Sequence, residues 1–158
     1  MTMHQEAPQE AEPSKGRSSK LVPELLVSNI STSLSFYTQV IGFSVVYDRP
    51  QEHFAFLSLN GAELMLDQAD SEIYDERTWW TARAEKPFGR GVNFQIEVPA
   101  VGPIIDRLVS SGWKLFRPLE EKWYQKGDKD VGNRQFLVQD PDGYLLRLFE
   151  DMGERPHA

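Results

Sequence analysis

An internal repeat constrains the fold of this chain more than any single motif does. The patterns that predict a strand, then a helix, then three strands occur twice along the sequence. The two copies keep nearly the same register, since Val27 corresponds to Val98 and Gly42 corresponds to Gly112. Self-similarity on this scale is typical of a fold built from two equivalent units.

The first copy is predicted to contain one amphipathic helix among four strands. Apolar residues at helical spacing over 31–41 indicate the helix, Asn29 can cap its start, and Gly42 ends it. Asn60-Gly61 is the strongest hairpin signal in the chain. The expected strands of this copy are residues 21–27, 43–47, 53–59 and 62–67.

The second copy repeats this order with one longer connection. Residues 92–98 alternate between apolar and polar, which predicts a strand, and residues 99–111 have helical spacing that Gly112 ends. Residues 118–130 are charged and are expected to form a loop. An Asp-Pro-Asp-Gly turn at 140–143 leads into the last strand. The other expected strands are residues 113–116, 135–138 and 144–149.

The expected domain boundaries lie where these patterns stop. Residues 1–20 are polar and cannot bury enough apolar surface to fold, so they are expected to form a disordered tail. One domain is expected over residues 21–151, followed by a C-terminal tail at 152–158. Within the domain we expect a first module at 21–68, a linker loop at 69–91 and a second module at 92–151.

Charge and composition exclude several kinds of partner and chemistry. The net charge of −7 at pH 7 argues against nucleic acid and anionic membranes, which attract basic surfaces, but is compatible with a cationic ligand. The absence of cysteine excludes disulfides, thiolate nucleophiles and Cys-based zinc sites. No apolar run is long enough for a membrane span or a signal peptide, so the expected location is the cytoplasm.

Two stretches of the chain resemble the vicinal oxygen chelate superfamily. They are Val-Ser-Asn-Ile-Ser-Thr-Ser-Leu-Ser-Phe-Tyr-Thr-Gln-Val-Ile-Gly-Phe at 27–43 and Asp-Pro-Asp-Gly-Tyr at 140–144. The superfamily includes glyoxalase I, extradiol dioxygenases, fosfomycin-resistance transferases and bleomycin-resistance proteins. The resemblance covers residues 21–151 and implies an α+β fold, with paired βαβββ modules that form a curved mixed sheet around a cleft.

Enzymes of this superfamily hold a divalent metal at four strand positions through His, Glu or Gln. Counted from the motifs that this chain shares with the superfamily, these positions fall on Val22, Met65, Asn93 and Arg147. Valine has no donor atom, methionine suits copper(I), asparagine alone is a weak donor, and arginine repels a cation. An alignment shift of one residue would offer Glu24 or Glu63, but no histidine cluster. We therefore expect no metal and no cofactor, with a metal-dependent lyase or dioxygenase as the alternative.

Arg147 is a lone charge in the middle of an apolar strand. Because an enclosed charge is costly unless it is paired, Arg147 either faces a polar cavity or meets a carboxylate in a structural ion pair. Strand alternation places further polar side chains on its face, and nearby loops supply aromatic ones. The expected ligand-binding residues are Glu24, Glu63, Met65, Asp67, Trp79, Trp80, Asn93, Gln95, Trp123, Tyr124, Arg147 and Phe149.

Acidic groups beside aromatic side chains suit a flat, cationic ligand. The bleomycin-resistance branch of the superfamily resembles this chain in lacking metal ligands and in the Leu-Leu-Arg-Leu sequence at 145–148. The resemblance implies a homodimer that sequesters a cationic glycopeptide, or a similar small molecule, without catalytic residues or turnover. The second alternative is an interaction or regulatory protein with no small ligand.

Overall fold

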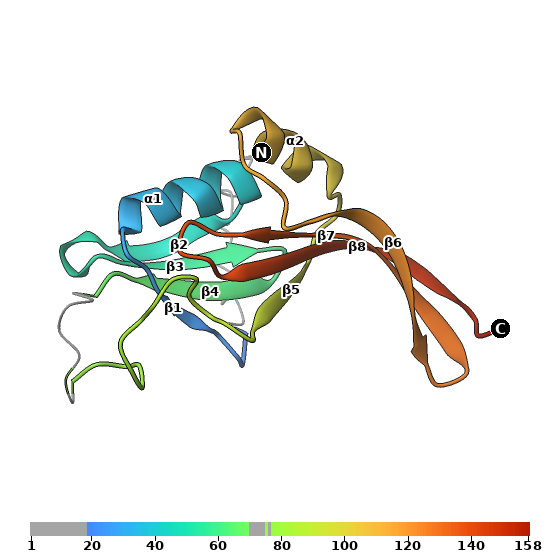
Figure 1. Ribbon diagram of the computed structural model, residues 1–158, viewed down its shortest axis with the longest axis horizontal. Helices are drawn as coiled ribbons and strands as arrows, with labels where there is room; N and C mark the ends of the chain where they lie inside the picture. Colours follow the sequence, from blue (N-terminus) through green and yellow to red (C-terminus); the bar gives the residue numbers. More distant parts are fainter. Residues whose placement is uncertain (1–18, 70–74, 76) are drawn as a thin grey trace, which may run out of the picture.

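The computed structural model of the protein describes residues 19–69, 75 and 77–158. Nearly all of the predicted tail at 1–20, and part of the predicted linker at 69–91, lie outside these described residues. The described part contains two four-stranded sheets, each covered by a helix on the same side (Figure 1). None of its helices is long and apolar enough to cross a membrane.

The first module forms a sheet with the strand order β1-β4-β3-β2. β1 pairs with β4 in parallel, and the other neighbours are antiparallel. Its elements are β1 (Glu24–Leu26), α1 (Ile30–Ser35), the π-helix η1 (Phe36–Ile41), β2 (Ser44–Arg49), the 3-10 helix η2 (Pro50–Glu52), β3 (Phe54–Leu59) and β4 (Ala62–Asp67). The side chain of Asn29 caps α1 by accepting a hydrogen bond from the N–H of Thr32, as predicted.

The second module repeats this arrangement with the strand order β5-β8-β7-β6. β5 pairs with β8 in parallel, as β1 pairs with β4. Its elements are β5 (Asn93–Glu97), α2 (Gly102–Ser110), β6 (Arg117–Lys126), β7 (Lys129–Gln139) and β8 (Leu145–Pro156). The two mixed sheets with their few helices confirm the α+β class with paired βαβββ modules.

The predictions for the last third of the chain were partly wrong. Residues 113–116 are not a strand, and residues 118–130 are not a loop, because β6 and β7 form a long antiparallel hairpin. β8 also continues to Pro156, so residues 152–156 pair with β7 rather than forming a tail. The three strands extend beyond the helices as an arm (Figure 1).

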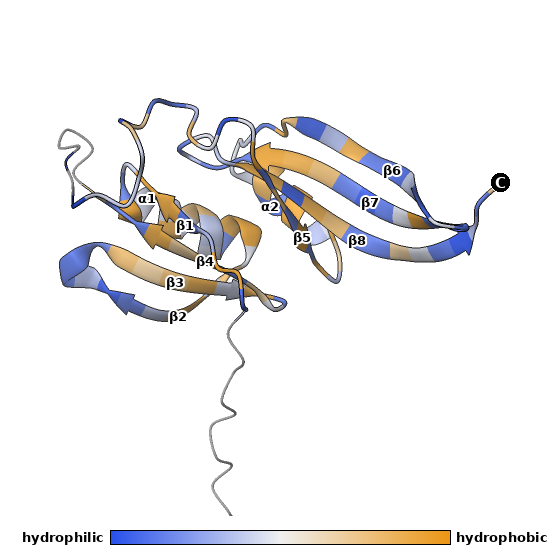
Figure 2. Ribbon diagram, turned by 90° about the horizontal axis from the view of Figure 1, so that it is seen from below, coloured by the Kyte–Doolittle hydropathy of each residue, from blue (hydrophilic) through white to orange (hydrophobic). Residues whose placement is uncertain are grey.

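The arm was missed because it carries little apolar alternation. It lies away from the helices, and its outer part is mostly hydrophilic, whereas the body of the molecule holds the hydrophobic segments (Figure 2). Side chains in the arm pack mainly against residues of the neighbouring strand. Gly132 shows this, because a Cβ atom added to it would lie 2.7 Å from the ring of Trp123, its register partner on β6. Such cross-strand packing leaves no periodic signal that single-sequence patterns can detect.

A single apolar core lies between the sheets and the helices. It includes residues from both modules, among them Leu57 and Leu66 from the first and Phe136 and Leu148 from the second. The helices also touch each other, since Arg107 on α2 donates hydrogen bonds of 2.7 and 3.0 Å to the carbonyl oxygens of Val40 and Ile41 in η1. The two modules therefore share one core rather than forming two independent ones.

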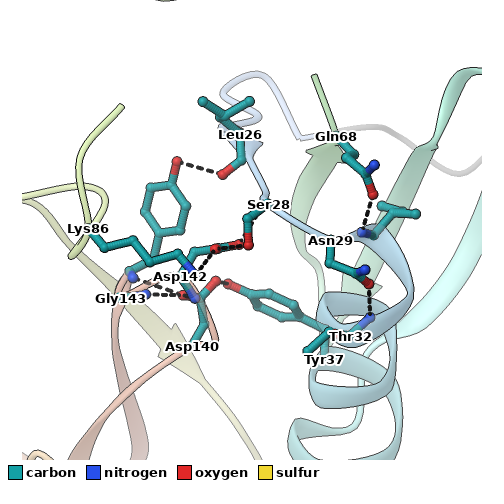
Figure 3. Close-up of polar contacts among 12 residues, drawn as sticks. Leu26, Ser28, Asn29, Thr32, Tyr37, Gln68, Lys86, Asp140, Asp142 and Gly143 are labelled. Atoms are coloured by element: carbon teal, nitrogen blue, oxygen red, sulfur yellow. Dashed lines mark hydrogen bonds and ion pairs between the residues drawn. The ribbon is translucent and has the colours of Figure 1, made fainter. Parts of the chain in front are cut away.

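The Asp-Pro-Asp-Gly turn between β7 and β8 is the polar centre of the module junction (Figure 3). Asp142 is 1% exposed and accepts hydrogen bonds from the backbone N–H and the hydroxyl of Ser28. The Lys86 ammonium lies 3.1 Å from the same carboxylate. This one side chain thus joins the second module to the end of β1 and to the linker.

Asp140 completes the junction from the same turn (Figure 3). One carboxylate oxygen accepts hydrogen bonds of 2.8–2.9 Å from three backbone N–H groups, those of Asp142, Gly143 and Tyr144. The other accepts a 2.9 Å hydrogen bond from the hydroxyl of Tyr37, which is fully buried in η1. Asp140 therefore fixes the shape of the turn and ties it to the helical layer of the first module.

The Asp140 carboxyl makes stability depend on pH. Burial raises its pKa from 3.8 to about 6, although the hydrogen bonds from Tyr37 and from the backbone act in the opposite direction. Between these pH values the folded protein binds more protons than the unfolded chain. The free energy of unfolding should therefore fall as the pH rises from about 4 to about 6, by up to about 3 kcal/mol from this group.

The variant Asp140→Asn should lack this component, because an amide does not titrate and its oxygen can still accept the backbone hydrogen bonds. Denaturant unfolding of both proteins from about pH 4 to about pH 7 measures the difference in pH dependence. Asp106→Asn, which changes an exposed carboxyl on α2, is the control and should keep the wild-type profile. Parallel profiles for wild type and Asp140→Asn would contradict the shifted pKa.

Candidate functional site

The face of each sheet that points away from the helices carries the candidate site, and we call it the open face. On the first sheet, Ala55, Leu57, Leu64 and Leu66 belong to the core under the helices. The alternate residues of the same strands therefore point to the open face. The cross-strand register arranges their side chains in rows across the sheet.

One row of the first open face combines a cation, an aromatic ring and a carboxylate. Arg49 pairs with Phe54, and Phe54 pairs with Asp67, across the neighbouring strands β2, β3 and β4. The Arg49 guanidinium carbon lies 3.8 Å from the centroid of the Phe54 ring. Its Nε also lies 2.6 Å from a carboxylate oxygen of Glu52. The guanidinium is thus stacked on the ring and held by the carboxylate of Glu52.

The next row is mostly apolar and ends in a second carboxylate. Tyr47, Phe56, Met65 and Glu24 are successive register partners across β2, β3, β4 and β1. The rings of Tyr47 and Phe56 are stacked, with centroids 5.1 Å apart and an interplanar angle of 17°. Phe56 is 7% exposed but lies outside the core under the helices. The open face therefore has an aromatic surface of its own.

The two carboxylates at the β1–β4 side of these rows are partly desolvated. Burial raises the pKa of Glu24, the negative charge of Asp67 raises it further, and Arg49 lowers it. Burial also raises the pKa of Asp67, and Arg49 again opposes the shift. Both acids are therefore destabilised in their charged form by their surroundings, and a nearby cation relieves that cost.

The second open face is built from amides and Arg147. Nη2 of Arg147 donates to Oε1 of Gln95, its register partner on β5. Gln135, which is 2% exposed, donates to the Glu120 carboxylate and the Tyr124 hydroxyl at 2.9 and 2.8 Å. The prediction that Arg147 meets a carboxylate is wrong for the described residues, because the amide of Gln95 takes that place.

Two polar atoms on the second open face have no partner. Oε1 of Gln135 and Nε of Arg147 are both buried and make no hydrogen bond to any described residue. Their strands are adjacent, since Leu137, two residues after Gln135, pairs with Arg147. One is an acceptor and the other a donor, and because neighbouring atoms cover both, each carries the cost of an unmade hydrogen bond.

The register corrects the positions carried over from the metal-binding enzymes. Glu24, rather than Val22, lies beside Met65, and Gln95, rather than Asn93, lies beside Arg147. These two register pairs therefore supply one carboxylate, one thioether, one amide and one guanidinium. The amide oxygen is already used by Arg147, whose positive charge opposes a cation. This set does not fit a hard divalent metal, and the described residues contain no group of three His, Asp or Glu side chains that could hold one.

The remaining predicted site residues are divided among several places. Asn93 and Phe149 share the open-face side of their strands with Gln95 and Arg147. Glu63 accepts a hydrogen bond from the backbone N–H of Ser19. Trp79 and Trp80 line a pocket of about 410 Å³ together with Asp67, and Trp79 is 86% exposed.

Trp123 and Tyr124 are adjacent on β6 and therefore point to opposite faces. Tyr124 lies on the open face, where its hydroxyl meets Gln135. Trp123 lies on the other face, where the guanidinium carbon of Arg155 is 4.0 Å from its ring centroid. The prediction that Trp123 lines the open face is thus not supported by the strand alternation.

Sequence reasoning missed the residues that form the aromatic surface. Tyr47, Phe54 and Phe56 were expected in strands but were not assigned to a face. The signal was present, since Phe54 and Phe56 alternate with Ala55 and Leu57. Arg49 was missed because β2 was expected to end at residue 47, whereas it continues to Arg49. Glu120 was missed because it lies in the arm, whereas Gln135 was expected in a strand but was not assigned to a face.

Two mixed four-stranded sheets built from paired βαβββ modules are the architecture of the glyoxalase fold class. The family model "Glyoxalase/Bleomycin resistance protein/Dioxygenase superfamily" matches residues 21–148. The chain therefore belongs to this superfamily.

Similar proteins of known sequence or structure agree with this assignment. A bleomycin resistance protein of Geobacillus stearothermophilus is 26% identical over 137 residues, which are 83% of this chain and 96% of the relative. The crystal structure of TioX from Micromonospora sp. ML1 has a TM-score of 0.61 at 20% identity, covering 85% of this chain and 100% of that one. A protein of unknown function from Agrobacterium tumefaciens str. C58 has a TM-score of 0.59 at 24% identity, covering 82% and 90%. The two structures support the shared fold.

Arg147 is expected to contribute little to stability. Its Nε is buried and has no partner among the residues that the structure describes, and the Gln95 side chain that Arg147 contacts is exposed and can bind water instead. Arg147→Met keeps much of the side-chain volume and removes the unpaired group. Its free energy of unfolding should lie within about 1 kcal/mol of wild type. Denaturant unfolding measures this; a loss of several kcal/mol would mean that the guanidinium is well paired in the folded protein.

Proposed function

We propose that the protein binds a flat, cationic small molecule on its open faces and sequesters it without chemical turnover. The observation that carries the proposal is the aromatic surface of Tyr47, Phe54 and Phe56 with the carboxylates of Glu24 and Asp67 beside it. An aromatic face attracts a cation through its quadrupole, and a partly desolvated carboxylate adds Coulomb attraction. The net charge of −7 favours the approach of such a ligand.

The second open face would bind the uncharged part of the same ligand. Oε1 of Gln135 and Nε of Arg147 are buried without a partner among the described residues, so an amide or a similar group that displaced the atoms covering them would satisfy both. A ligand with cationic and amide groups has the chemistry of a cationic glycopeptide, the ligand class that the resemblance to bleomycin-resistance proteins implies. The similar protein of Geobacillus stearothermophilus is named for bleomycin resistance.

The donor set of the two register pairs that contain Met65 and Arg147 supports sequestration rather than metal-dependent catalysis. A metal-dependent lyase or dioxygenase needs several hard donors around one ion, whereas this chain presents a guanidinium and a thioether there. We propose a metal-free protein on this chemical ground. Stoichiometric, tightly held metal after incubation with manganese, iron, nickel and zinc would overturn this part of the proposal.

We further propose that the protein acts as a cytoplasmic homodimer. The edge strand β2 is exposed along its whole length, and it includes Val45 at 43% and Val46 at 58% exposure. Apolar side chains on an unpaired strand edge favour association with another chain. Sedimentation of the purified protein tests the dimer.

The direct test of function is a titration of the metal-free protein with bleomycin, followed by calorimetry and tryptophan fluorescence. Trp79 and Trp80, which share a pocket with Asp67, should report an occupied site. Saturable binding in the micromolar range or tighter supports sequestration. Absence of binding to bleomycin and to a panel of aromatic cations would instead favour an interaction protein without a small ligand.

Asp67 should be needed for the cationic part of binding. Asp67→Asn removes one negative charge beside Phe54 and should weaken bleomycin binding about tenfold, or about 1.4 kcal/mol. The control is Asp106→Asn, which removes the same charge from the exposed side of α2. Equal affinities for the two variants would mean that only the overall charge of the protein matters.

A further inference from the structure

We infer that Arg49 occupies the subsite that receives the planar cation of a ligand, so that its guanidinium is an internal competitor which the ligand displaces. The inference rests on the proposed function and adds a chemical class to it: planar cations of the guanidinium or amidinium type. It also assigns Arg49 a role as the residue that limits affinity and selects among ligands.

The position of the Arg49 side chain gives the first support. Its guanidinium carbon is 3.8 Å from the Phe54 ring centroid, which is a stacking distance for a planar cation on an aromatic ring. Phe54 is 5% exposed, although it lies outside the core under the helices. The ring is therefore kept from water by groups on the open face, and the guanidinium is one of them.

The surrounding charges give the second support. Asp67 is the register partner of Phe54, and Arg49 lowers the pKa of both Asp67 and Glu24. Among the described residues, neither of these carboxylates takes part in a hydrogen bond or ion pair. They therefore act on a cation above Phe54 through space, and they are free to make direct contacts with a better-placed cation.

The weak attachment of Arg49 makes displacement feasible. The side chain is 45% exposed, and Glu52, its one ion-pair partner in the described part of the chain, is 63% exposed. Exposed ion pairs of this kind stabilise proteins little, because water solvates both groups well when they separate. Arg49 is also the last residue of the edge strand β2. Its side chain can therefore swing outward without disturbing the sheet.

The experiment compares wild type with Arg49→Met, using benzamidinium as the cationic probe and benzamide as its neutral isostere. Calorimetry, or NMR titration for weak binding, measures both affinities. Vacating the subsite should raise the benzamidinium affinity roughly five- to tenfold, because the probe no longer competes with an internal cation for Phe54 and Asp67. The affinity for benzamide should change little.

Arg155→Met is the matched control. Arg155 is also stacked on an aromatic ring, at 4.0 Å from the Trp123 centroid, and its side chain is 52% exposed and paired with a carboxylate, Asp130. It lies on the face of β8 opposite to the open face. This variant loses the same charge as Arg49→Met, so it should show no rise in benzamidinium affinity if the subsite is specific.

Two results would overturn the inference. One is an unchanged or lower benzamidinium affinity in Arg49→Met, which would mean that Arg49 is structural or itself contacts the ligand. The other is an equal rise in the benzamidinium affinity of Arg155→Met, which would mean that the loss of one positive charge anywhere on the protein causes the rise. The bleomycin titration separates this test from the proposed function. If wild type binds bleomycin but Arg49→Met binds neither bleomycin nor benzamidinium more tightly than wild type does, only the inference about Arg49 fails.

Discussion

The buried turn between β7 and β8 is the constraint on which the rest of the molecule depends. Two carboxylates, Asp140 and Asp142, are enclosed there at 4% and 1% exposure. Burying them is tolerable only because backbone N–H groups, two hydroxyls and one ammonium surround them. Their partners come from η1, the end of β1 and the linker. The free-energy cost of removing the two carboxylates from water is therefore offset only when both modules are in place.

The groups that join the two modules lie on the opposite side of the sheets from the candidate site. The helical side of the sheets holds the shared core and the junction, where the buried carboxylates of Asp140 and Asp142 are hydrogen-bonded. The open faces instead hold Gln135 and Arg147, each with one buried atom that has no partner among the described residues. They also hold the carboxylates of Glu24 and Asp67, which make no hydrogen bond or ion pair to a described residue. A ligand site can keep such unsatisfied groups because the other side of the same strands supplies the stability.

The features of the fold that could be predicted from sequence were those with a periodic apolar signal. The repeat, both helices and the Asp-Pro-Asp-Gly turn belong to the core side, where burial dictates residue type. The arm could not be predicted, because its packing is between neighbouring strands, as in the Trp123–Gly132 pair. On the open face, the lone arginine was a usable signal, but its partner depended on register. A parallel pairing such as that of β1 with β4 decides whether Val22 or Glu24 stands beside Met65, and spacing along the chain does not contain that information.

The repeat described at the outset is symmetric in backbone but not in chemistry. Glu24 and Met65 of the first module stand where Gln95 and Arg147 stand in the second. A molecule made of two identical halves would present the same surroundings to both ends of a ligand and would bind it equally well either way round. Here one half offers rings and negative charge, and the other offers amides and a positive charge. Under the proposed function, this broken symmetry would give the site a direction, because an elongated ligand with unlike ends would fit the two open faces in only one orientation.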